Sequence, residues 1–369
     1  MDSTTDQPTV PPMREVRYEY TPILPKILTH LKASILVTTY QAGKLLVLGA
    51  RDDQLQISFL DYDQPMGLAV SRDCLAIGSR RQIHFLVPAH QTQSHQEHYD
   101  GCFVPRSSFY TGTVQGHDLG WGADGLWIVN TLFSCLSTLH DDFSFVPQWR
   151  PPFISQLIDQ DRCHLNGLAL ENGRPRFITA MSDTDGPASW RPNKATTGIV
   201  MDVENASVVC RGLCMPHSPR QYAQRLWVLN SGCGEFGWID ETSGRYQVME
   251  QMPGYTRGLS FSGQFAFVGL SKIRESSVFD GVPIAQKREE LRCGVGVVDL
   301  STGKTVAVFQ FLSGVTEIFS VEVLQGFANP LIAGASVDQQ QREVWIVPSE
   351  DSPRPQPYPR VSIFHNSNR

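Results

Sequence analysis

The chain has 369 residues, a formal net charge of −6 and only 18% charged residues, together with 30 glycines and 24 prolines. Low charge and abundant turn-forming residues are typical of a loop-rich β protein rather than of a helical one. The negative charge, without a long basic run, argues against nucleic acid as a partner. No stretch of 18 apolar residues occurs, which argues against a membrane-spanning helix.

The start of the chain is polar and carries three prolines without an apolar segment, so we expect a disordered N-terminus at 1–13 and no signal peptide or membrane anchor. A cytoplasmic protein without a membrane partner is therefore expected. A single folded domain is predicted over 14–350, with a short helix within 14–33. The polar, proline-rich residues 351–369 are predicted to form a mobile tail.

Three short apolar runs follow at 35–40, 44–48 and 55–60. Their order matches the second to fourth strands of a β-propeller blade, which leaves this blade without its inner strand. Residues 317–323 can supply that strand from the other end of the chain. The ring is thus predicted to close by joining both ends in one blade, which protects the sheet edges.

Six similar segments recur about every 50 residues, the length expected of a propeller blade. The residues at their matching positions are Met66, His117, Asn166, His217, Arg257 and Glu317. The first five are each followed, about ten residues later, by an apolar, β-branched or aromatic run that indicates a buried strand. We therefore predict an all-β, six-bladed propeller of four-stranded antiparallel blades. A seven-bladed ring is the alternative, because the strand-like segment 331–348 has no clear place in six blades.

The matching positions are predicted to converge on the central channel of the ring. Because strand side chains repeat their direction every two residues, His164 is expected to face the same side as Asn166. Neutral imidazoles are common ligands of zinc, iron and manganese, so His117, His164 and His217 are the candidate ligands of a divalent metal. Glu317 would be a fourth ligand or a general base. The alternative is that these histidines hydrogen-bond one another and ordered water.

Two arginines belong to the same surroundings, Arg257 at a matching position and Arg220 three residues after His217. A guanidinium near the site would hold a carboxylate or phosphate and stabilise developing negative charge. Arg220, Arg257 and Glu317 are therefore the candidate catalytic residues. Salt bridges with Glu317, Asp118 or Glu235 are the alternative role of the arginines.

Residues 89–116 are interpreted as a long loop, and long loops of compact domains often act as lids or binding loops. We expect this loop to cover one mouth of the channel, where Arg106 and Tyr110 would contact the substrate together with Asn166. A solvated loop is the alternative. Residues 182–197 are a second candidate loop for the same face.

The eight cysteines are scattered without the paired CxxC spacing of a metal site. Free, buried thiols are therefore predicted rather than a disulfide framework.

Several stretches that span nearly the whole chain carry a resemblance to a known family: 39–45, 105–106 with 111–112, 117–118, 164–169, 217–220 with 226–227, and 317–319 with 326 and 329–330. In them the sequence resembles a conserved bacterial propeller family of uncharacterised function, some members of which adjoin tetratricopeptide-repeat proteins.

More distantly, 166–169 is similar to the inner strand of six-bladed gluconolactonase and regucalcin-like propellers. Those proteins hold a divalent metal through Glu and Asn side chains, which implies such roles for Asn166 and Glu317. The three histidines depart from that pattern. They look closer to channel sites of amidating lyases, with three histidines on zinc, or of carotenoid oxygenases, with four on iron.

These observations together predict a metal-dependent enzyme with a histidine-rich channel site that acts on a small or peptide-like, anionic substrate. Hydrolase, lyase and oxygenase chemistry all stay open. The sequence contains no GxSxG elbow, P-loop or dinucleotide fingerprint, which disfavours serine hydrolysis, nucleotide chemistry and NAD chemistry. The alternative is a non-catalytic scaffold that binds a protein partner on its loop face.

Overall fold

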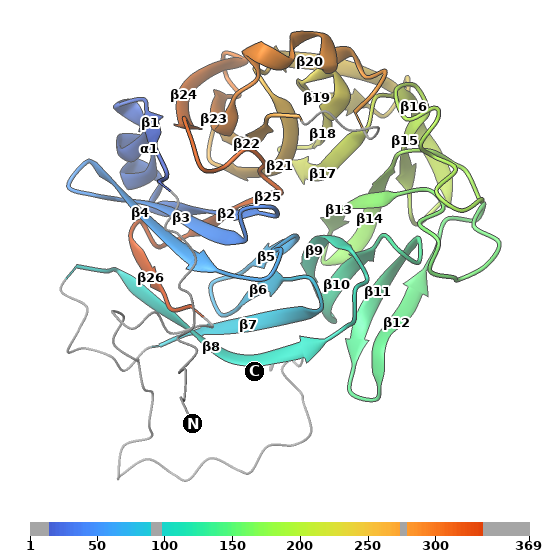
Figure 1. Cartoon of the computed structure of the whole chain (residues 1–369), viewed down its shortest axis with the longest axis horizontal. Coiled ribbons are helices and arrows are strands. Elements are labelled where there is room, and N and C mark those ends of the chain that lie inside the picture. The colour runs from blue at the N-terminus through green and yellow to red at the C-terminus, as the bar shows by residue number, and fades with distance from the viewer. Residues whose placement is uncertain (1–14, 90–97, 274–278, 335–369) are drawn as a thin grey trace, which may run out of the picture.

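The computed structural model describes residues 15–89, 98–273 and 279–334, which form six β-sheets arranged as a ring (Figure 1). The first strands of neighbouring blades contact one another all the way round, from β5 through β9, β13, β17, β21 and β25 back to β5. The prediction of a six-bladed propeller is therefore confirmed.

Five blades are built from consecutive antiparallel strands, with the first strand at the channel. Their strands are β5 Leu68–Val70, β6 Leu75–Gly78, β7 Gln82–Pro88 and β8 Gly101–Tyr110; β9 Gly116–Gly122, β10 Gly125–Asn130, β11 Cys135–His140 and β12 Phe143–Trp149; β13 Leu165–Glu171, β14 Arg174–Ala180, β15 Gly198–Asp202 and β16 Ser207–Leu213; β17 Pro216–Tyr222, β18 Arg225–Asn230, β19 Glu235–Asp240 and β20 Arg245–Gln251; and β21 Tyr255–Ser262, β22 Phe265–Ser271, β23 Cys293–Asp299 and β24 Lys304–Phe311. Two 3-10 helices, η1 Ser231–Cys233 and η2 Pro283–Glu290, lie in the connections.

The sixth blade joins the two ends of the described chain. Its strands are β25 Ser320–Gln325, β2 Ala33–Thr39, β3 Lys44–Arg51 and β4 Gln54–Asp61. The inner strand β25 pairs antiparallel with β2, from Ala33 opposite Gln325 to Thr38 opposite Ser320. The predicted closure of the ring is confirmed, and Glu317 lies in the turn just before the closing strand.

Two short strands extend neighbouring blades at their outer edges. β1 Tyr18–Tyr20 pairs with β24, and β26 Pro330–Ile332 runs parallel to the start of β8. The segment 331–348, which the six-blade count left without a place, thus begins in this edge strand. Its residues from 335 onward, like the predicted terminal segments 1–13 and 351–369, lie outside the described residues.

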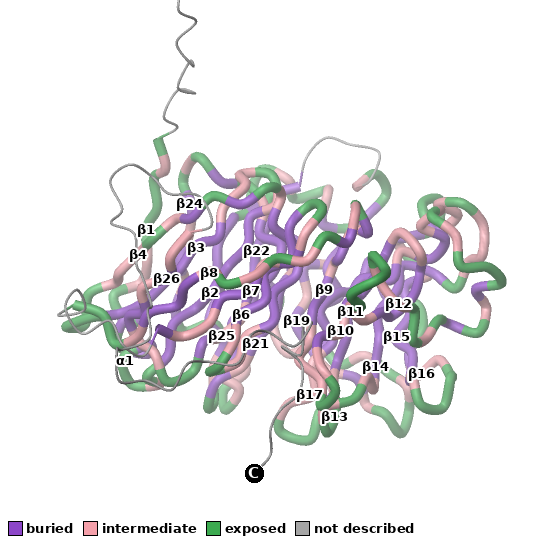
Figure 2. The backbone as a smooth tube through the Cα atoms, turned by 90° about the horizontal axis from the view of Figure 1, so that it is seen from below, coloured by how far each residue is buried: buried purple, intermediate pink, exposed green. Residues whose placement is uncertain are grey.

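The helix expected within 14–33 is α1 Ile23–Leu31, whose apolar side packs against β3 and β24. Its buried Leu24 and Leu28 belong to a hydrophobic cluster shared by the fifth and sixth blades. Similar clusters lie between the other blades, so most of the core is inter-blade packing, and burial concentrates in the strands (Figure 2). No helix in 15–89, 98–273 or 279–334 is long and apolar enough to cross a membrane.

The interpretation of 89–116 as one loop is wrong over Gly101–Tyr110, which form the outer strand β8. This strand pairs with β7 along nearly its whole length, and its burial alternates between half-buried and exposed after Val104. Pro105 is tolerated because β26 covers only the first three residues of the strand, which leaves the remainder as a sheet edge. Residues 90–97 lie outside the described parts of the chain.

Candidate functional site

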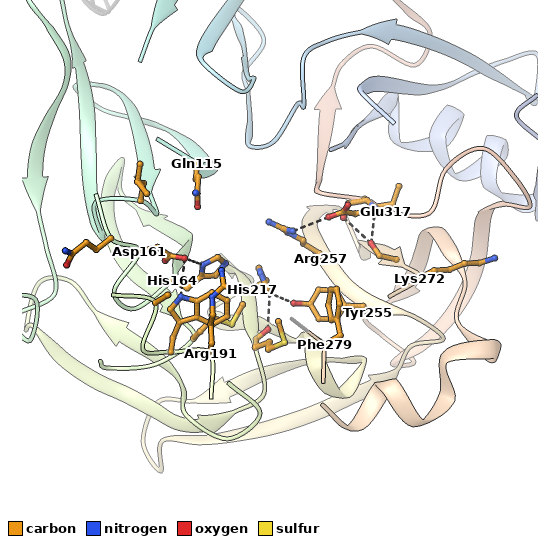
Figure 3. Close-up of a pocket in the computed structure, with 18 of the residues that line it drawn as sticks. Gln115, Asp161, His164, Arg191, His217, Tyr255, Arg257, Lys272, Phe279 and Glu317 are labelled. Carbon is orange, nitrogen blue, oxygen red and sulfur yellow. Dashed lines mark hydrogen bonds and ion pairs between the residues drawn. The ribbon is translucent and has the colours of Figure 1, made fainter. Parts of the chain in front are cut away.

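A cavity of about 530 Å³ opens among the turns that lead into the inner strands (Figure 3). Four of the predicted site residues line it: His164, His217, Arg257 and Glu317. Apolar and aromatic residues form about half of its remaining wall, among them Trp190, Tyr255, Phe279, Met181 and Met215, and polar residues such as Asp161, Arg191 and Lys272 form the rest. The cavity therefore combines a few converging polar groups with apolar walls, as small-molecule sites do.

One backbone turn recurs at four blades, and it positions His164 and His217 among these side chains. Gln64, Gln115, His164 and Met215 each have a left-handed φ of 47°, 53°, 50° and 51°, and each lies two residues before a matching position. Such a φ is uncommon for residues other than glycine and marks a conformation held by its surroundings. Because β13 begins only at Leu165, His164 lies in the turn before the strand. The alternation of side chains along a strand, from which its direction was predicted, therefore does not apply to it.

His164 is held by a carboxylate and an indole. Its Nδ1 donates to Asp161 Oδ2 at 2.8 Å, and the same oxygen accepts from Trp190 Nε1 at 3.1 Å. The indole ring also packs on the imidazole, with ring centroids 4.3 Å apart, and Trp190 is only 2% exposed. Asp161 and Trp190 together fix the position and tautomer of His164.

His117 and His217 are held in a similar way by backbone carbonyls. Nδ1 of His117 lies 3.0 Å from the carbonyl oxygen of Gln115, and Nδ1 of His217 lies 2.9 Å from that of Met215. A carbonyl oxygen only accepts, so each Nδ1 carries the hydrogen and each Nε2 keeps its lone pair. The turn residues that orient the chain thus also set the tautomers of both imidazoles.

Both of these histidines are neutral near pH 7. Burial lowers the pKa of His117 and of His217 well below the usual 6.5, and the positive charge of Arg257 and the imidazole of His164 lower it further. The rings of His117 and His164 meet edge to face with centroids 4.8 Å apart. The structure therefore brings the predicted histidines together, although His117 lies behind His164 and does not line the cavity.

Arg257 points toward the middle of the cavity, which Arg191 and Lys272 also line (Figure 3). Its Nη1 lies 3.7 Å from Glu317 Oε1, and its guanidinium carbon lies 3.4 Å from the centroid of the Phe319 ring. Its Nη2 is buried and has no hydrogen-bond partner within the described residues. Burial lowers the pKa of Arg257, an effect that Glu317 opposes. The Arg257 guanidinium thus keeps a buried, unsatisfied N–H donor in a residue that lines the cavity.

Arg220 belongs to a different part of the channel, where it makes the salt bridge that was the alternative to a catalytic role. It binds both carboxylate oxygens of Asp118 at 2.8 and 3.2 Å, and its Nη2 donates to Glu322 at 3.0 Å. These three residues come from β17, β9 and β25, so the network ties three blades together. Arg220 lines a separate, smaller cavity of about 230 Å³.

The three residues predicted to bind substrate do not line the 530 Å³ cavity. Asn166 is buried in β13, where its Oδ1 accepts from Thr179 at 2.7 Å and its Nδ2 has no partner within the described chain. Arg106 and Tyr110 lie on the outer strand β8 with exposed side chains, and Tyr110 is 70% exposed. The expectation that they reach the channel depended on a loop that is instead a strand.

Sequence reasoning missed Asp161, Tyr255 and the orienting role of Trp190. Asp161 precedes His164 by three residues, a spacing that could have suggested an Asp–His pair. Trp190 lies within the second candidate loop, 182–197, which indeed contributes to the cavity wall. Tyr255 precedes Arg257 by two residues, and its hydroxyl lies 3.4 Å from His217 Nδ1.

The expected divalent metal stays a prediction. Among the side chains that the structure describes, no group of three or more His, Cys, Asp or Glu residues is placed so that it could hold a metal ion.

The fold and the site define a six-bladed β-propeller with a ligand-sized cavity at its channel, lined by two histidines, two arginines and a lysine among other residues. The chain belongs to the family described as a domain of unknown function, DUF4915, whose model matches residues 22–333. The resemblance to an uncharacterised propeller family is thereby confirmed. A search of curated proteins gives no match.

Solved structures support the fold alone. A chain of a nidogen/laminin complex is 12% identical with a TM-score of 0.50, and the alignment covers 80% of this chain and 99% of that chain. TolB from Acinetobacter baumannii is 13% identical with a TM-score of 0.45, over 81% of this chain and 66% of that chain.

Proposed function

We propose that the channel cavity binds a small molecule with an anionic group and that His164, supported by Asp161, acts on it as a general base. The protein would then be an enzyme of proton-transfer chemistry. The observation that carries the proposal is that Arg257, whose Nη2 is buried without a partner, lines the same cavity as His164, whose Nε2 has no hydrogen-bond partner in the described part of the chain.

Arg257 supplies the binding step. A buried guanidinium with an unpaired N–H group is unfavourable, because a lost hydrogen bond to a charged donor is not replaced by water. A carboxylate or phosphate oxygen would satisfy Nη2 while Glu317 keeps Nη1. The neutral His217 adds no competing positive charge, and the aromatic wall formed by Trp190, Tyr255 and Phe279 would cover the apolar part of the ligand.

His164 supplies the chemical step. Its Nδ1–H donates to the Asp161 carboxylate, so Nε2 has the lone pair that accepts a proton, and the carboxylate stabilises the imidazolium that forms. The proton would come from an O–H, N–H or acidic C–H group of the ligand beside the anion that Arg257 holds. Arg257 would also stabilise negative charge that develops on the ligand.

A divalent metal on His117, His164 and His217 is the second candidate, with one observation in its favour. In all three residues Nδ1 donates to a carbonyl or carboxylate, which is how metal-binding histidines are commonly oriented. Metal roles for Asn166 and Glu317, implied by the similarity to gluconolactonase-like propellers, are a further form of this proposal.

The decisive experiment screens the purified full chain against small carboxylic and phosphorylated acids. Ligand-observed NMR measures binding and turnover for the wild type, Arg257→Gln, His164→Gln and the control His140→Gln, which changes an exposed histidine of β11. We expect Arg257→Gln to lose binding and His164→Gln to bind but not turn over. Binding that is equal in the wild type and Arg257→Gln would refute the anion site.

Elemental analysis addresses the second candidate. The untagged wild type, reconstituted with zinc, iron or manganese, is compared with a His117→Ala, His217→Ala double variant. Near-stoichiometric metal that is lost from a still-folded double variant would support the metal site. Absence of metal from the reconstituted wild type would eliminate it. A protein-binding scaffold is left as the alternative if neither a ligand nor a metal binds.

A further inference from the structure

Two cysteines from different segments meet beside the channel cavity. Cys214 directly precedes the turn residue Met215, and Cys233 ends η1. The interaction between the two thiols raises the pKa of Cys214 and lowers that of Cys233. The backbone around them is also tied together, since Gly232 N donates to the Cys214 carbonyl at 2.9 Å and Cys214 N donates to Asn230 Oδ1 at 2.7 Å.

The absence of a side chain at Gly232 leaves room for the Cys214 sulfur. A Cβ atom on Gly232 would lie 2.2 Å from Cys214 Sγ, closer than any real contact. The Cys214 sulfur therefore fits against the backbone of η1, next to the residue that precedes Cys233.

Cys233 is the accessible and reactive member of the pair. It is half-buried and lines a surface cavity of about 940 Å³ beside η2, whereas Cys214 is buried. The hydrogen bond from the Cys214 thiol lowers the pKa of Cys233, with a smaller contribution from Asn230, while burial opposes this effect. Burial instead raises the pKa of the other half-buried cysteine, Cys74, to about 11. Thiolate character and exposure together determine which thiol a peroxide oxidises.

We propose that Cys214 and Cys233 are a modification site, a peroxide-reactive thiol pair that closes to a disulfide. The Cys233 thiolate attacks hydrogen peroxide, the O–O bond breaks, and a sulfenic acid and hydroxide form. The Cys214 sulfur then attacks the sulfenic sulfur and expels its oxygen. Two thiols and one peroxide give one disulfide and two water molecules, so atoms and electrons balance, and a dithiol reductant reverses the reaction.

The disulfide would act on the channel site through His217. The two sulfurs must approach to about 2.0 Å, which moves at least one of the two segments. Each segment carries a partner of His217 Nδ1, since Met215 follows Cys214 and Ser231, two residues before Cys233, places its Oγ 3.1 Å from that nitrogen. An effect on catalysis rests on the proposed function, whereas formation of the disulfide does not.

The experiment oxidises the reduced, full-length protein with hydrogen peroxide and follows it by intact mass and non-reducing peptide mapping. We expect loss of two hydrogen atoms and one cross-linked peptide pair that joins 214 to 233. Cys233→Ser should form no disulfide and should consume peroxide about tenfold more slowly. Cys74→Ser is the matched control and should behave as the wild type.

Hydrogen exchange measured before and after oxidation tests the coupling to the site. Faster or slower exchange of the peptides that contain 215–217 supports the movement of the Met215 turn, and unchanged exchange there overturns it. Sulfinic acid at Cys233 without a cross-link, or preferential oxidation of Cys74, would overturn the thiol pair itself. Cys233 is half exposed, so its serine variant keeps the fold and the test does not depend on replacing buried Cys214.

Discussion

Glu322 is expected to make the stability of the ring fall as the pH rises through neutrality. Its carboxylate shares one guanidinium, that of Arg220, with the carboxylate of Asp118, so the buried group is net negative when both acids are ionised. Ser260 Oγ donates to the second oxygen of Glu322 at 3.1 Å. Burial, with a contribution from Asp118, raises the pKa of Glu322 from 4.5 to about 7.

The magnitude follows from the difference between the folded and unfolded pKa of Glu322. The interval from 4.5 to about 7, at about 1.4 kcal/mol per pKa unit, corresponds to roughly 3 kcal/mol. Because the folded pKa is the higher one, this stabilisation is fully present below pH 4.5 and is lost as the pH rises through about 7. Between pH 4.5 and 8 the free energy of unfolding of the wild type should therefore fall by roughly 3 kcal/mol because of Glu322. The Glu322→Gln variant, which is neutral at this position, should not show this loss.

The assay is urea unfolding followed by tryptophan fluorescence at pH 5 and pH 8, under conditions where unfolding is reversible. The free energy of unfolding of Glu322→Gln minus that of the wild type should be larger at pH 8. Glu241→Gln, in an exposed turn, is the control and should show no such change. A difference between Glu322→Gln and wild type that is the same at both pH values would refute the reasoning.

Three further outcomes are expected. Arg220→Met should destabilise the protein by about 3–5 kcal/mol in urea unfolding at pH 8, because it leaves two buried carboxylates without their cation; a loss below 1 kcal/mol would contradict this. Gly258→Ala should lower the free energy of unfolding by about 2 kcal/mol more than Gly212→Ala. Both glycines have a φ of 83°, but only at position 258 would a Cβ meet β25, 2.5 Å from a backbone nitrogen. Equal losses of stability in the two variants would show that backbone strain alone matters. Long-range ¹H–¹⁵N NMR should show His117 and His217 neutral at pH 6, with the hydrogen on Nδ1. Because their pKa is lowered on folding, these residues stabilise the fold above pH 6.5 and lose this contribution as the pH falls. Titration of either residue near pH 6.5 in the native state would contradict the prediction.

The architecture could be predicted because the ring repeats one local pattern. Each blade places an inner-strand residue at the same position, and the recurrence of about 50 residues survives differences in the loops. The closing blade could be predicted for the same reason, since 35–60 supplies three strands and lacks the inner one. The error at Gly101–Tyr110 is also physical, because an outer strand has a weak apolar pattern and, as a sheet edge, can contain a proline.

The site could be predicted only in part, because matching positions say which residues approach the channel but not what those residues contact. His217 and Arg257 were found in this way, and Arg220 was placed in the same surroundings although it is occupied by Asp118 and Glu322. Trp190 supports His164 from 26 residues further along the chain, beyond strands β13 and β14, and no local pattern in the sequence indicates this contact.

The repeated turn explains why the site is confined to one side of the ring. Four blades offer the same left-handed residue two places before the matching position, yet only one of these turn residues is a histidine. At the first blade the matching residue is the buried, apolar Met66, and at the second His117 is covered by the His164 ring. The matching positions that line the cavity are therefore those of His217, Arg257 and Glu317, joined by the turn residue His164. The fold thus brings one residue of each blade to an equivalent position at the channel. The candidate site forms where successive blades place a proton acceptor, a cation and aromatic side chains around one cavity.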